Sequence, residues 1–227
     1  MPEVHTLEQQ VLAKNDSLAA LNRRELSRRG VLSLNILSSP GAGKTRVLER
    51  TIADLDQSVV CQVIEGDQAT EQDALRIRRA GAQAVQINTG NGCHLEADML
   101  ASGIKILQPR ESNILFIENV GNLVCPALFD LGETRRVVIL SVTEGEDKPI
   151  KYPYIFHNAD LLLINKIDLL PHLEFDLQRC LDYVTTVNPS LMTLCVSAQT
   201  GEGMDEWYQW LQKERAALTP SEPCEEM

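Results

Sequence analysis

The sequence predicts an α/β fold in which a mostly parallel sheet of about seven strands carries helices on both faces. Seven short apolar, β-branched runs recur along the chain, and amphipathic stretches with helical spacing separate most of them. Strands that alternate with helices form βαβ units, and such units build parallel sheets. The length of 227 residues and the 44% hydrophobic content suit a soluble protein with one main domain and a real core.

The apolar runs place the expected strands at residues 31–37, 59–64, 84–87, 113–118, 137–142, 160–165 and 191–196. The amphipathic stretches place helices at 45–55, 70–80, 95–102, 173–186 and 204–217. Residues 4–29 lack Gly and Pro and repeat apolar side chains at near-helical spacing, so we expect one or two helices there, outside the main fold and ended by Gly30. The predicted organisation is a helical extension at 1–30, a main domain at 31–218 and a flexible polar tail at 219–227.

The charge balance excludes several classes of partner. The formal net charge is −11, which argues against a general nucleic-acid binder, although backbone N–H groups can still hold phosphate locally. No apolar run approaches the roughly 18–20 residues that span a membrane, and the N-terminus lacks a secretory pattern. We therefore expect a cytoplasmic protein whose six cysteines are free thiols or metal ligands.

A phosphate-binding loop follows the first expected strand. Residues 38–45, SSPGAGKT, resemble a Walker A loop, although Ser38 replaces the first glycine of that pattern. Lys44 would reach the β- and γ-phosphates, and the Thr45 hydroxyl would bind Mg²⁺. Further nucleotide contacts would come from Gly41, Ala42, Gly43 and Arg46. The alternative is a Gly-rich turn with a surface lysine. The strand–loop–helix context favours a P-loop NTPase with the three-layer fold.

Two later segments indicate which base the nucleotide carries. The run 160–168 ends in the N-K-x-D pattern of Asn165, Lys166 and Asp168, which resembles the guanine-recognition element of P-loop GTPases. A carboxylate at Asp168 accepts hydrogen bonds from guanine, whereas adenine offers no such pair of donors. Ser197 and Ala198 then resemble the S-A element that buttresses guanine. GTP and GDP are therefore the expected ligands, and the alternatives are a charged turn or an ATP-dependent kinase.

The strand ends supply candidate catalytic groups. Glu118 and Gly121 occupy the place of the D-x-x-G element, where the carboxylate would hold Mg²⁺ and the glycine N–H would meet the γ-phosphate. Asp67 ends another strand and is assigned to Mg²⁺ or to the attacking water, with Asp73 as its alternative. The expected Mg²⁺ set is thus Thr45, Asp67 and Glu118.

A second metal site is indicated by two cysteines and a histidine. Cys93 and His94 follow a Gly-rich approach, and Cys125 lies four residues beyond Gly121. Thiolate and imidazole ligands suit Ni²⁺ or Zn²⁺. Three ligands leave the coordination shell incomplete, which suggests an open position or sharing across a dimer. The alternative is ordinary buried cysteine.

Together, SSPGAGKT, EGD, TGNGCHLE, IENVGNLVCPALFDLGE, SVTEGEDKPIKYP, NKIDLLP and SAQTGEGM resemble the HypB family, the GTPases of nickel–iron hydrogenase maturation. The resemblance spans about residues 34–204. It implies a SIMIBI-class GTPase with slow intrinsic hydrolysis, a homodimer when GTP is bound, and delivery of nickel to the hydrogenase large-subunit precursor. It also implies that Cys93, His94 and Cys125 bind the metal, that Lys148 faces the nucleotide or the dimer partner, and that a HypA-type nickel chaperone docks on the N-terminal helices.

The sequence departs from some members of that family in one respect. No cysteine precedes Cys61 and His5 is the only early histidine, so we expect neither the N-terminal nickel motif nor the histidine-rich storage tract. Two alternatives stay open. One is a related metallo-GTPase for another nickel enzyme or a cobalamin enzyme, and the other is a metal-buffering protein with a vestigial GTPase.

Overall fold

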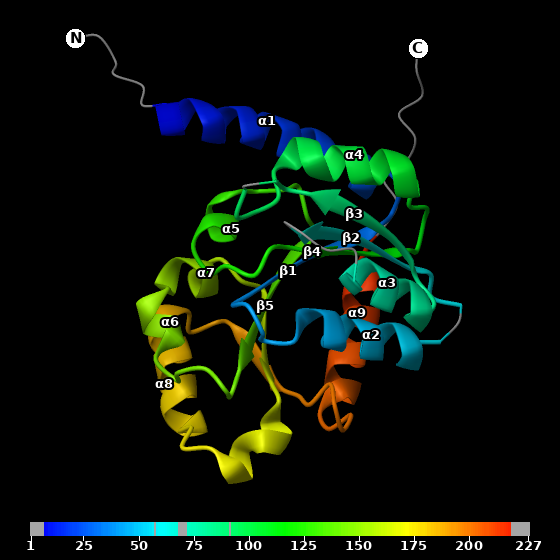
Figure 1. Cartoon of the computed structure of the whole chain (residues 1–227). Coiled ribbons are helices and arrows are strands. Elements are labelled where there is room, and N and C mark those ends of the chain that lie inside the picture. Colours follow the sequence, from blue (N-terminus) through cyan, green and yellow to red (C-terminus); the bar gives the residue numbers. More distant parts are fainter. Residues whose placement is uncertain (1–6, 57, 68–71, 91, 219–227) are drawn as a thin grey trace, which may run out of the picture.

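A single parallel sheet of seven strands organises the molecule, and the fold class expected from the sequence is confirmed (Figure 1). The computed structural model describes residues 7–56, 58–67, 72–90 and 92–218; the predicted tail, His5 and Cys224 lie outside them. The strand order is β3-β2-β4-β1-β5-β6-β7. The strands are β1 Leu32–Ser38, β2 Cys61–Asp67, β3 Gln83–Asn88, β4 Ile114–Glu118, β5 Arg135–Ser141, β6 Leu161–Asn165 and β7 Met192–Cys195.

Helices cover both faces of this sheet. They are α1 Leu7–Arg28, α2 Lys44–Asp54, α3 Gln72–Ala80, α4 Ala97–Leu107, α5 Cys125–Leu128, α6 Lys148–Lys151, α7 Pro153–His157, α8 Leu177–Val187 and α9 Met204–Ala216, with a 3-10 helix at Ile167–His172. The sequence pattern did not predict α5, α6, α7 or the 3-10 turn. Elements of four to six residues are too short to show a helical period.

Strand parity divides the core into two faces. Leu34, Phe116 and Ile139 pack with side chains of α2, α3 and α9 on one face. Their neighbours Leu115 and Ile117 point to the other face, where α1 and α4 cover them. Because successive strand residues alternate between faces, Glu118 lies on the α2 side of β4 and the next residue, Asn119, follows on the α1 and α4 side.

The N-terminal helix is part of the main fold, which corrects the expectation of an extension outside it. It is one helix, α1, and its Ala19 and Leu26 are fully or almost fully buried. Leu26 joins a core cluster with Leu100 and Ile104 of α4, and the two helices lie side by side in Figure 1. The leucine spacing correctly indicated a helix, but spacing alone does not show what a helix packs against.

The topology places the phosphate loop at the carboxyl end of β1, the central strand of the sheet. β1 lies between β4 and β5, and the chain after β1 connects toward β2 on one side of it, whereas the chain after β4 crosses to β5 on the other. Ligands of open α/β sheets bind at the carboxyl ends of strands where the order reverses in this way. Among the described helices, none is long and apolar enough to cross a membrane.

Candidate functional site

The phosphate loop connects β1 to α2 through two glycines in the left-handed region. Gly41 has φ 77° and Gly43 has φ 98°, and α2 begins directly afterwards at Lys44. A Cβ on Gly43 would lie 2.7 Å from Nδ2 of Asn165, so glycine also provides the close approach that this contact requires. The N-terminus of α2 therefore faces the loop with free N–H groups, which favours an anion there.

Lys44 and Thr45 each hydrogen-bond a neighbouring side chain. A bound phosphate would replace the partner of Lys44, and a bound cation would be shared between Thr45 and its partner. The Lys44 ammonium donates to Ser38 Oγ at 3.1 Å, so the serine that replaces the usual glycine serves as its partner. Thr45 Oγ1 donates to Glu118 Oε1 at 2.7 Å. Burial lowers the pKa of Lys44, while Glu118 acts in the opposite direction. This lysine is poised to gain from a negatively charged ligand.

Two buried carboxyl groups lie beside Lys44, and the positive charge of that lysine only partly offsets the cost of ionising them. Glu65 and Glu118 are register partners on β2 and β4 and are 2% and 3% exposed. Burial raises the pKa of Glu65 to about 8, with Glu118 adding to it, and burial raises the pKa of Glu118 to about 7. Oε2 of each has no hydrogen-bond partner among the described residues. Oxygen atoms in this state fit a hard divalent cation such as Mg²⁺.

The two aspartates considered for the Mg²⁺ site or the attacking water, Asp67 and Asp73, lie in different environments. Asp67 ends β2, two residues beyond Glu65, and is half-buried. Asp73 lies in the first turn of α3, where Arg76 binds it at 2.9 Å. Both are close enough to Glu65 to raise the pKa of that carboxyl. Asp73 is therefore paired with an arginine of its own helix, whereas Asp67 lies at the carboxyl end of β2, where it faces the strand end that carries Glu65.

The expected guanine element lies against the phosphate loop. Asn165 donates to the Ala42 carbonyl at 2.9 Å and accepts from the Ala198 N–H at 3.2 Å, so one carboxamide joins the ends of β6 and β7 to the loop. Lys166 adopts φ 65° and its ammonium donates to the Gly41 carbonyl at 2.7 Å.

Asp168 and Arg46 complete this side of the site. Ser197 Oγ donates to Asp168 Oδ1 at 2.5 Å, which fixes the carboxylate that would read the base. Arg46 is exposed near the start of α2 and contacts Gln199, the residue after Ala198, at 3.4 Å. All residues predicted to bind the nucleotide thus surround one loop.

The segment after β4 contacts both the phosphate loop and the cysteine segment. A Cβ on Gly121 would lie 2.9 Å from Pro40 Cα, so this turn touches the backbone of the phosphate loop. Asn119 is 1% exposed. Its carboxamide oxygen accepts from the N–H groups of Leu95 at 3.0 Å and Val120 at 2.9 Å. Leu95 follows His94 directly, so Asn119 connects the nucleotide side to the metal side.

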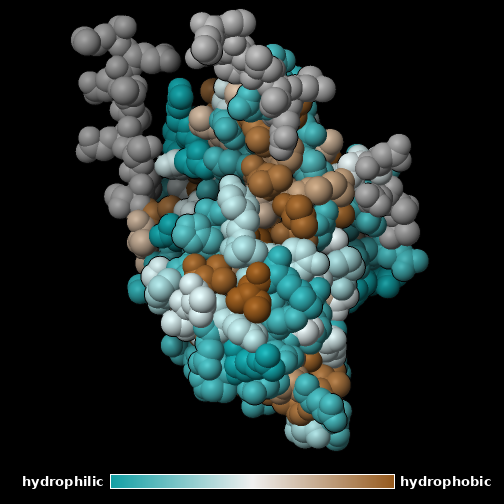
Figure 2. All heavy atoms as spheres, turned by 90° about the vertical axis from the view of Figure 1, so that its left-hand side faces the viewer, coloured by the Kyte–Doolittle hydropathy of each residue, from teal (hydrophilic) through white to brown (hydrophobic). Residues whose placement is uncertain are grey.

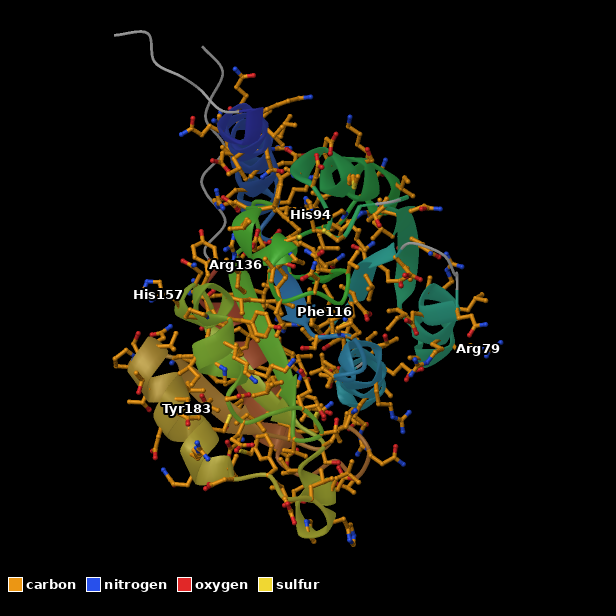
Figure 3. All side chains as sticks on the ribbon, turned by 60° about the vertical axis from the view of Figure 1, so that its left-hand side comes forward. Arg79, His94, Phe116, Arg136, His157 and Tyr183 are labelled. Atoms are coloured by element: carbon orange, nitrogen blue, oxygen red, sulfur yellow. The ribbon has the colours of Figure 1, made fainter. Side chains whose placement is uncertain are left out.

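The predicted metal ligands lie together although β4 separates them along the chain. Ligand atoms of Cys93, His94 and Cys125 are within 4.8 Å of one another. Figure 3 places His94 beneath α4. Its ring lies 3.9 Å from that of Phe129, between centroids. Burial lowers the pKa of His94, and a hydrogen bond with Cys125 is the largest cause that raises the pKa of Cys93. A neutral imidazole and two adjacent sulfurs suit a borderline-soft cation.

Comparison with known proteins decides the family. Residues 33–194 match the family model described as CobW/HypB/UreG, nucleotide-binding domain. The hydrogenase maturation factor HypB of Rhizobium leguminosarum bv. viciae is 58% identical over 206 residues, which are 91% of this chain and 69% of that protein. The chain belongs to the HypB family.

Solved HypB structures share its architecture. HypB from Helicobacter pylori, in a complex with nickel, has a TM-score of 0.85 and 36% identity over 89% of this chain and 95% of that one. HypB from Archaeoglobus fulgidus has a TM-score of 0.84 and 40% identity over 90% of this chain and all of that one. The seven-stranded P-loop fold described above is therefore the fold of HypB proteins.

Two residues of the site were not indicated by the motif reading. Glu65 lies two residues before Asp67 on the same strand, so strand parity gave a signal that it shares a face with the other carboxylates. Asn119 carried no such signal, because an asparagine after a strand usually indicates a turn. The role of Asn119 as a connector depends on the hydrogen bond that it accepts from the N–H of Leu95, a residue distant in the sequence.

Proposed function

We propose that this chain is a GTP-hydrolysing metallochaperone that delivers nickel to the large-subunit precursor of nickel–iron hydrogenase. The observation that carries the proposal is the contact of one short segment, residues 118–125, with both sites. It begins at the Glu118 carboxylate beside Thr45, touches the phosphate loop at Gly121 and ends at Cys125 beside Cys93. Family membership supports the hydrogenase as the recipient, and the nickel complex of the Helicobacter pylori relative supports nickel as the cargo.

The nucleotide residues have distinct roles in this proposal. Backbone N–H groups of Gly41, Ala42 and Gly43 bind phosphate oxygens, Lys44 balances the β- and γ-phosphate charge, and Asp168 accepts the guanine donors. The residues that would hold Mg²⁺ are Thr45, Asp67 and Glu118, and the ion would supply charge stabilisation at the phosphates. The supporting contacts to the base come from Arg46, Asn165, Lys166, Ser197 and Ala198.

Hydrolysis depends on positioning and charge rather than on a covalent intermediate. The Gly121 N–H meets the γ-phosphate, and Asp67 serves either the Mg²⁺ ion or the attacking water. Loss of the γ-phosphate releases Gly121, and the segment through Cys125 relaxes. The change reaches the metal because Cys125 and the Asn119-bound Leu95 belong to the two arms of the site. Binding of GTP and binding of nickel then alter each other by the same factor.

We further propose that the GTP-bound chain forms a homodimer, docks a HypA-type nickel chaperone and works in the cytoplasm. Residues 31–218 carry the GTPase and metal-site residues, and α1 packs against them as part of the same fold. Apolar side chains exposed near that site, Val124, Leu128 and Tyr154, support a dimer surface there. Apolar patches lie on the face that Figure 2 views, which is the side of α5–α8. Lys148, paired with Glu144 at 3.6 Å, is the first residue of α6 on this side.

The test compares nucleotide binding, metal binding and maturation in one set of variants. GTP should displace a fluorescent GDP analogue at least a hundredfold better than ATP does. Lys44→Ala should abolish hydrolysis and hydrogenase maturation while leaving nickel binding to Cys93, His94 and Cys125 intact. Maturation that survives Lys44→Ala would mean that the chain only buffers metal. Equal displacement by ATP would overturn the assignment of Asp168.

A further inference from the structure

The two arms of the proposed metal site are fastened together by a third element, the N-terminal helix. One arm carries Cys93 and His94 and runs into α4 at Ala97; the other runs from Cys125 through α5 to Leu131. α1 lies across both arms. The contacts are made by polar side chains in a helix that is otherwise buried through apolar ones.

Asn15 joins the arms with a single carboxamide. Its oxygen accepts from the Ala97 N–H at 2.9 Å, and its nitrogen donates to the Asp130 carbonyl at 2.7 Å. The side chain is 4% exposed. One rigid planar group therefore fixes the distance between the start of α4 and the loop after α5.

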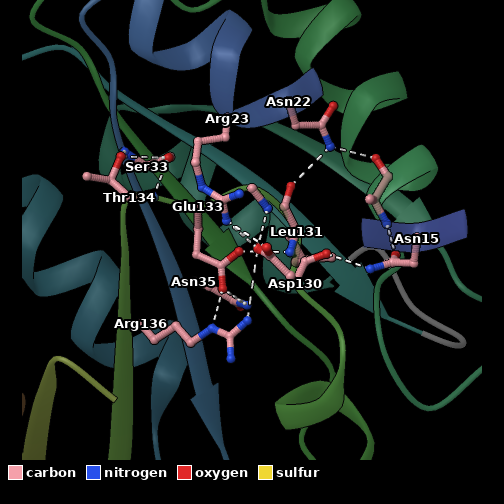
Figure 4. Close-up of polar contacts among 12 residues, drawn as sticks. Asn15, Asn22, Arg23, Ser33, Asn35, Asp130, Leu131, Glu133, Thr134 and Arg136 are labelled. Atoms are coloured by element: carbon pink, nitrogen blue, oxygen red, sulfur yellow. Dashed lines mark hydrogen bonds and ion pairs between the residues drawn. The ribbon is translucent and has the colours of Figure 1, made fainter. Parts of the chain in front are cut away.

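Asn22 repeats the arrangement two turns further along α1. Its nitrogen donates to the carbonyls of Ala97 at 2.7 Å and Leu131 at 3.0 Å, and the residue is 5% exposed (Figure 4). Residues seven apart lie on the same face of a helix. Arg23 adds an ion pair to the carboxylate of Asp130 at 2.7 Å.

Packing alone does not account for these asparagines. Asparagine is a weaker helix former than leucine, and a buried carboxamide must satisfy every donor and acceptor that it carries. The carboxamide nitrogens of both residues, and the oxygen of Asn15, bond to the arms that bear the ligands. Ala97 lies three residues after His94, and the ring of Phe129, next to Asp130, packs against the His94 ring at a tilt of 31°. The clamp thus acts on His94, the metal ligand of the first arm that contacts the second arm through Phe129.

We propose that Asn15 and Asn22 are positioning residues that make α1 a clamp, holding Cys93 and His94 at metal-binding distance from Cys125. The inference rests on the proposed metal site. It goes further in making metal affinity depend on how α1 is seated. Whatever shifts this helix then changes metal affinity, and metal binding in turn favours the seated helix.

The experiment measures Ni²⁺ affinity by competition with a chromophoric chelator in Asn15→Ala, Asn22→Ala and the double variant. Ser17→Ala is the matched control, because among the described residues its hydroxyl bonds within α1, to the Ala13 carbonyl. Residues that hold a ligand in place typically contribute 10–100-fold to metal affinity. We expect a loss of about tenfold in each single variant, a larger loss in the double variant and a changed Ni²⁺–thiolate absorption band. The Mg²⁺–GDP affinity should stay within about twofold of wild type, since that site is not clamped.

Three further results separate the outcomes. Asn15→Asp keeps the acceptor for Ala97 but places a buried carboxylate oxygen against the Asp130 carbonyl, so it should weaken Ni²⁺ binding at least as much as Asn15→Ala does, and the single variants should remain folded even where the double variant is not. Unchanged Ni²⁺ affinity in both single variants would overturn the clamp while leaving the metal site in place. Wild-type binding that Cys93→Ala does not weaken would overturn the metal site itself, and the clamp with it.

Discussion

Asn119→Ala tests the contact between the nucleotide side and the metal side. Asn119 is 1% exposed and makes three hydrogen bonds through its side chain, to Leu95 N–H, Val120 N–H and, at 3.3 Å, Asn35 Oδ1. The Leu95 N–H belongs to a fully buried residue, and a buried donor left without a partner costs about 1–3 kcal/mol. Adding the partial loss at the other two partners, we expect the free energy of unfolding to fall by about 2–4 kcal/mol.

Urea unfolding of the nucleotide-free chain measures this loss, with Asn158→Ala as the matched control. Asn158 is exposed and its side chain bonds to the Tyr154 carbonyl at 2.8 Å, so its removal should cost less than about 1 kcal/mol. In the same samples, the factor by which a GTP analogue changes nickel affinity should shrink toward one. Equal losses of stability in the two variants, or an unaltered nucleotide effect on nickel affinity, would show that Asn119 does not connect the two sites.

Three further outcomes follow from the site. Asp168→Asn should weaken GDP binding by about 1.5–3 kcal/mol, roughly ten- to hundredfold, and an unchanged Kd in fluorescence titration would contradict the base assignment. Gly121→Ala should weaken binding of a GTP analogue more than of GDP, because its Cβ would press on the Pro40 backbone; calorimetry should find the ratio of the two Kd values altered. Without Mg²⁺ or nucleotide, stability should fall as pH rises from about 4.5 to about 8, because the raised pKa of Glu65 means that the folded chain binds the proton more tightly. Each such proton contributes up to about 1.4 kcal/mol per pH unit, so urea midpoints should depend less on pH in Glu65→Gln than in wild type.

Much of the fold could be predicted because its signals are local. Each of the seven strands carries an apolar run, and the long helices show a clear period. The boundaries shift by a few residues; for example, α4 begins at Ala97 rather than at residue 95, because the backbone of Glu96 is extended at the N-cap and the Leu95 N–H bonds to Asn119. The placement of α1 was not predictable, since its burial depends on a surface built by α4 and the loop after α5.

Some residues of the candidate site could likewise be predicted from local motifs, and others could not because they depend on contacts between distant segments. Lys44, Thr45 and Asp168 belong to contiguous motifs whose backbone geometry is local, so their positions followed from the sequence. Cys93 follows β3 and Cys125 follows β4, and the sheet brings the two segments together because β2 pairs with both strands. Glu65 and the asparagines of α1 act through contacts between distant segments, which a motif does not record.

Nickel affinity measured in two nucleotide states shows whether residues 118–125 couple nucleotide binding to nickel binding. Competition with a chelator would be measured in Mg²⁺–GDP and in a non-hydrolysable Mg²⁺–GTP analogue, with Cys93→Ala as the control. We predict a difference of at least tenfold, about 1.4 kcal/mol, that disappears in the control. Equal affinity in the two states would contradict it, because the segment from Glu118 to Cys125 would then carry no information between the sites.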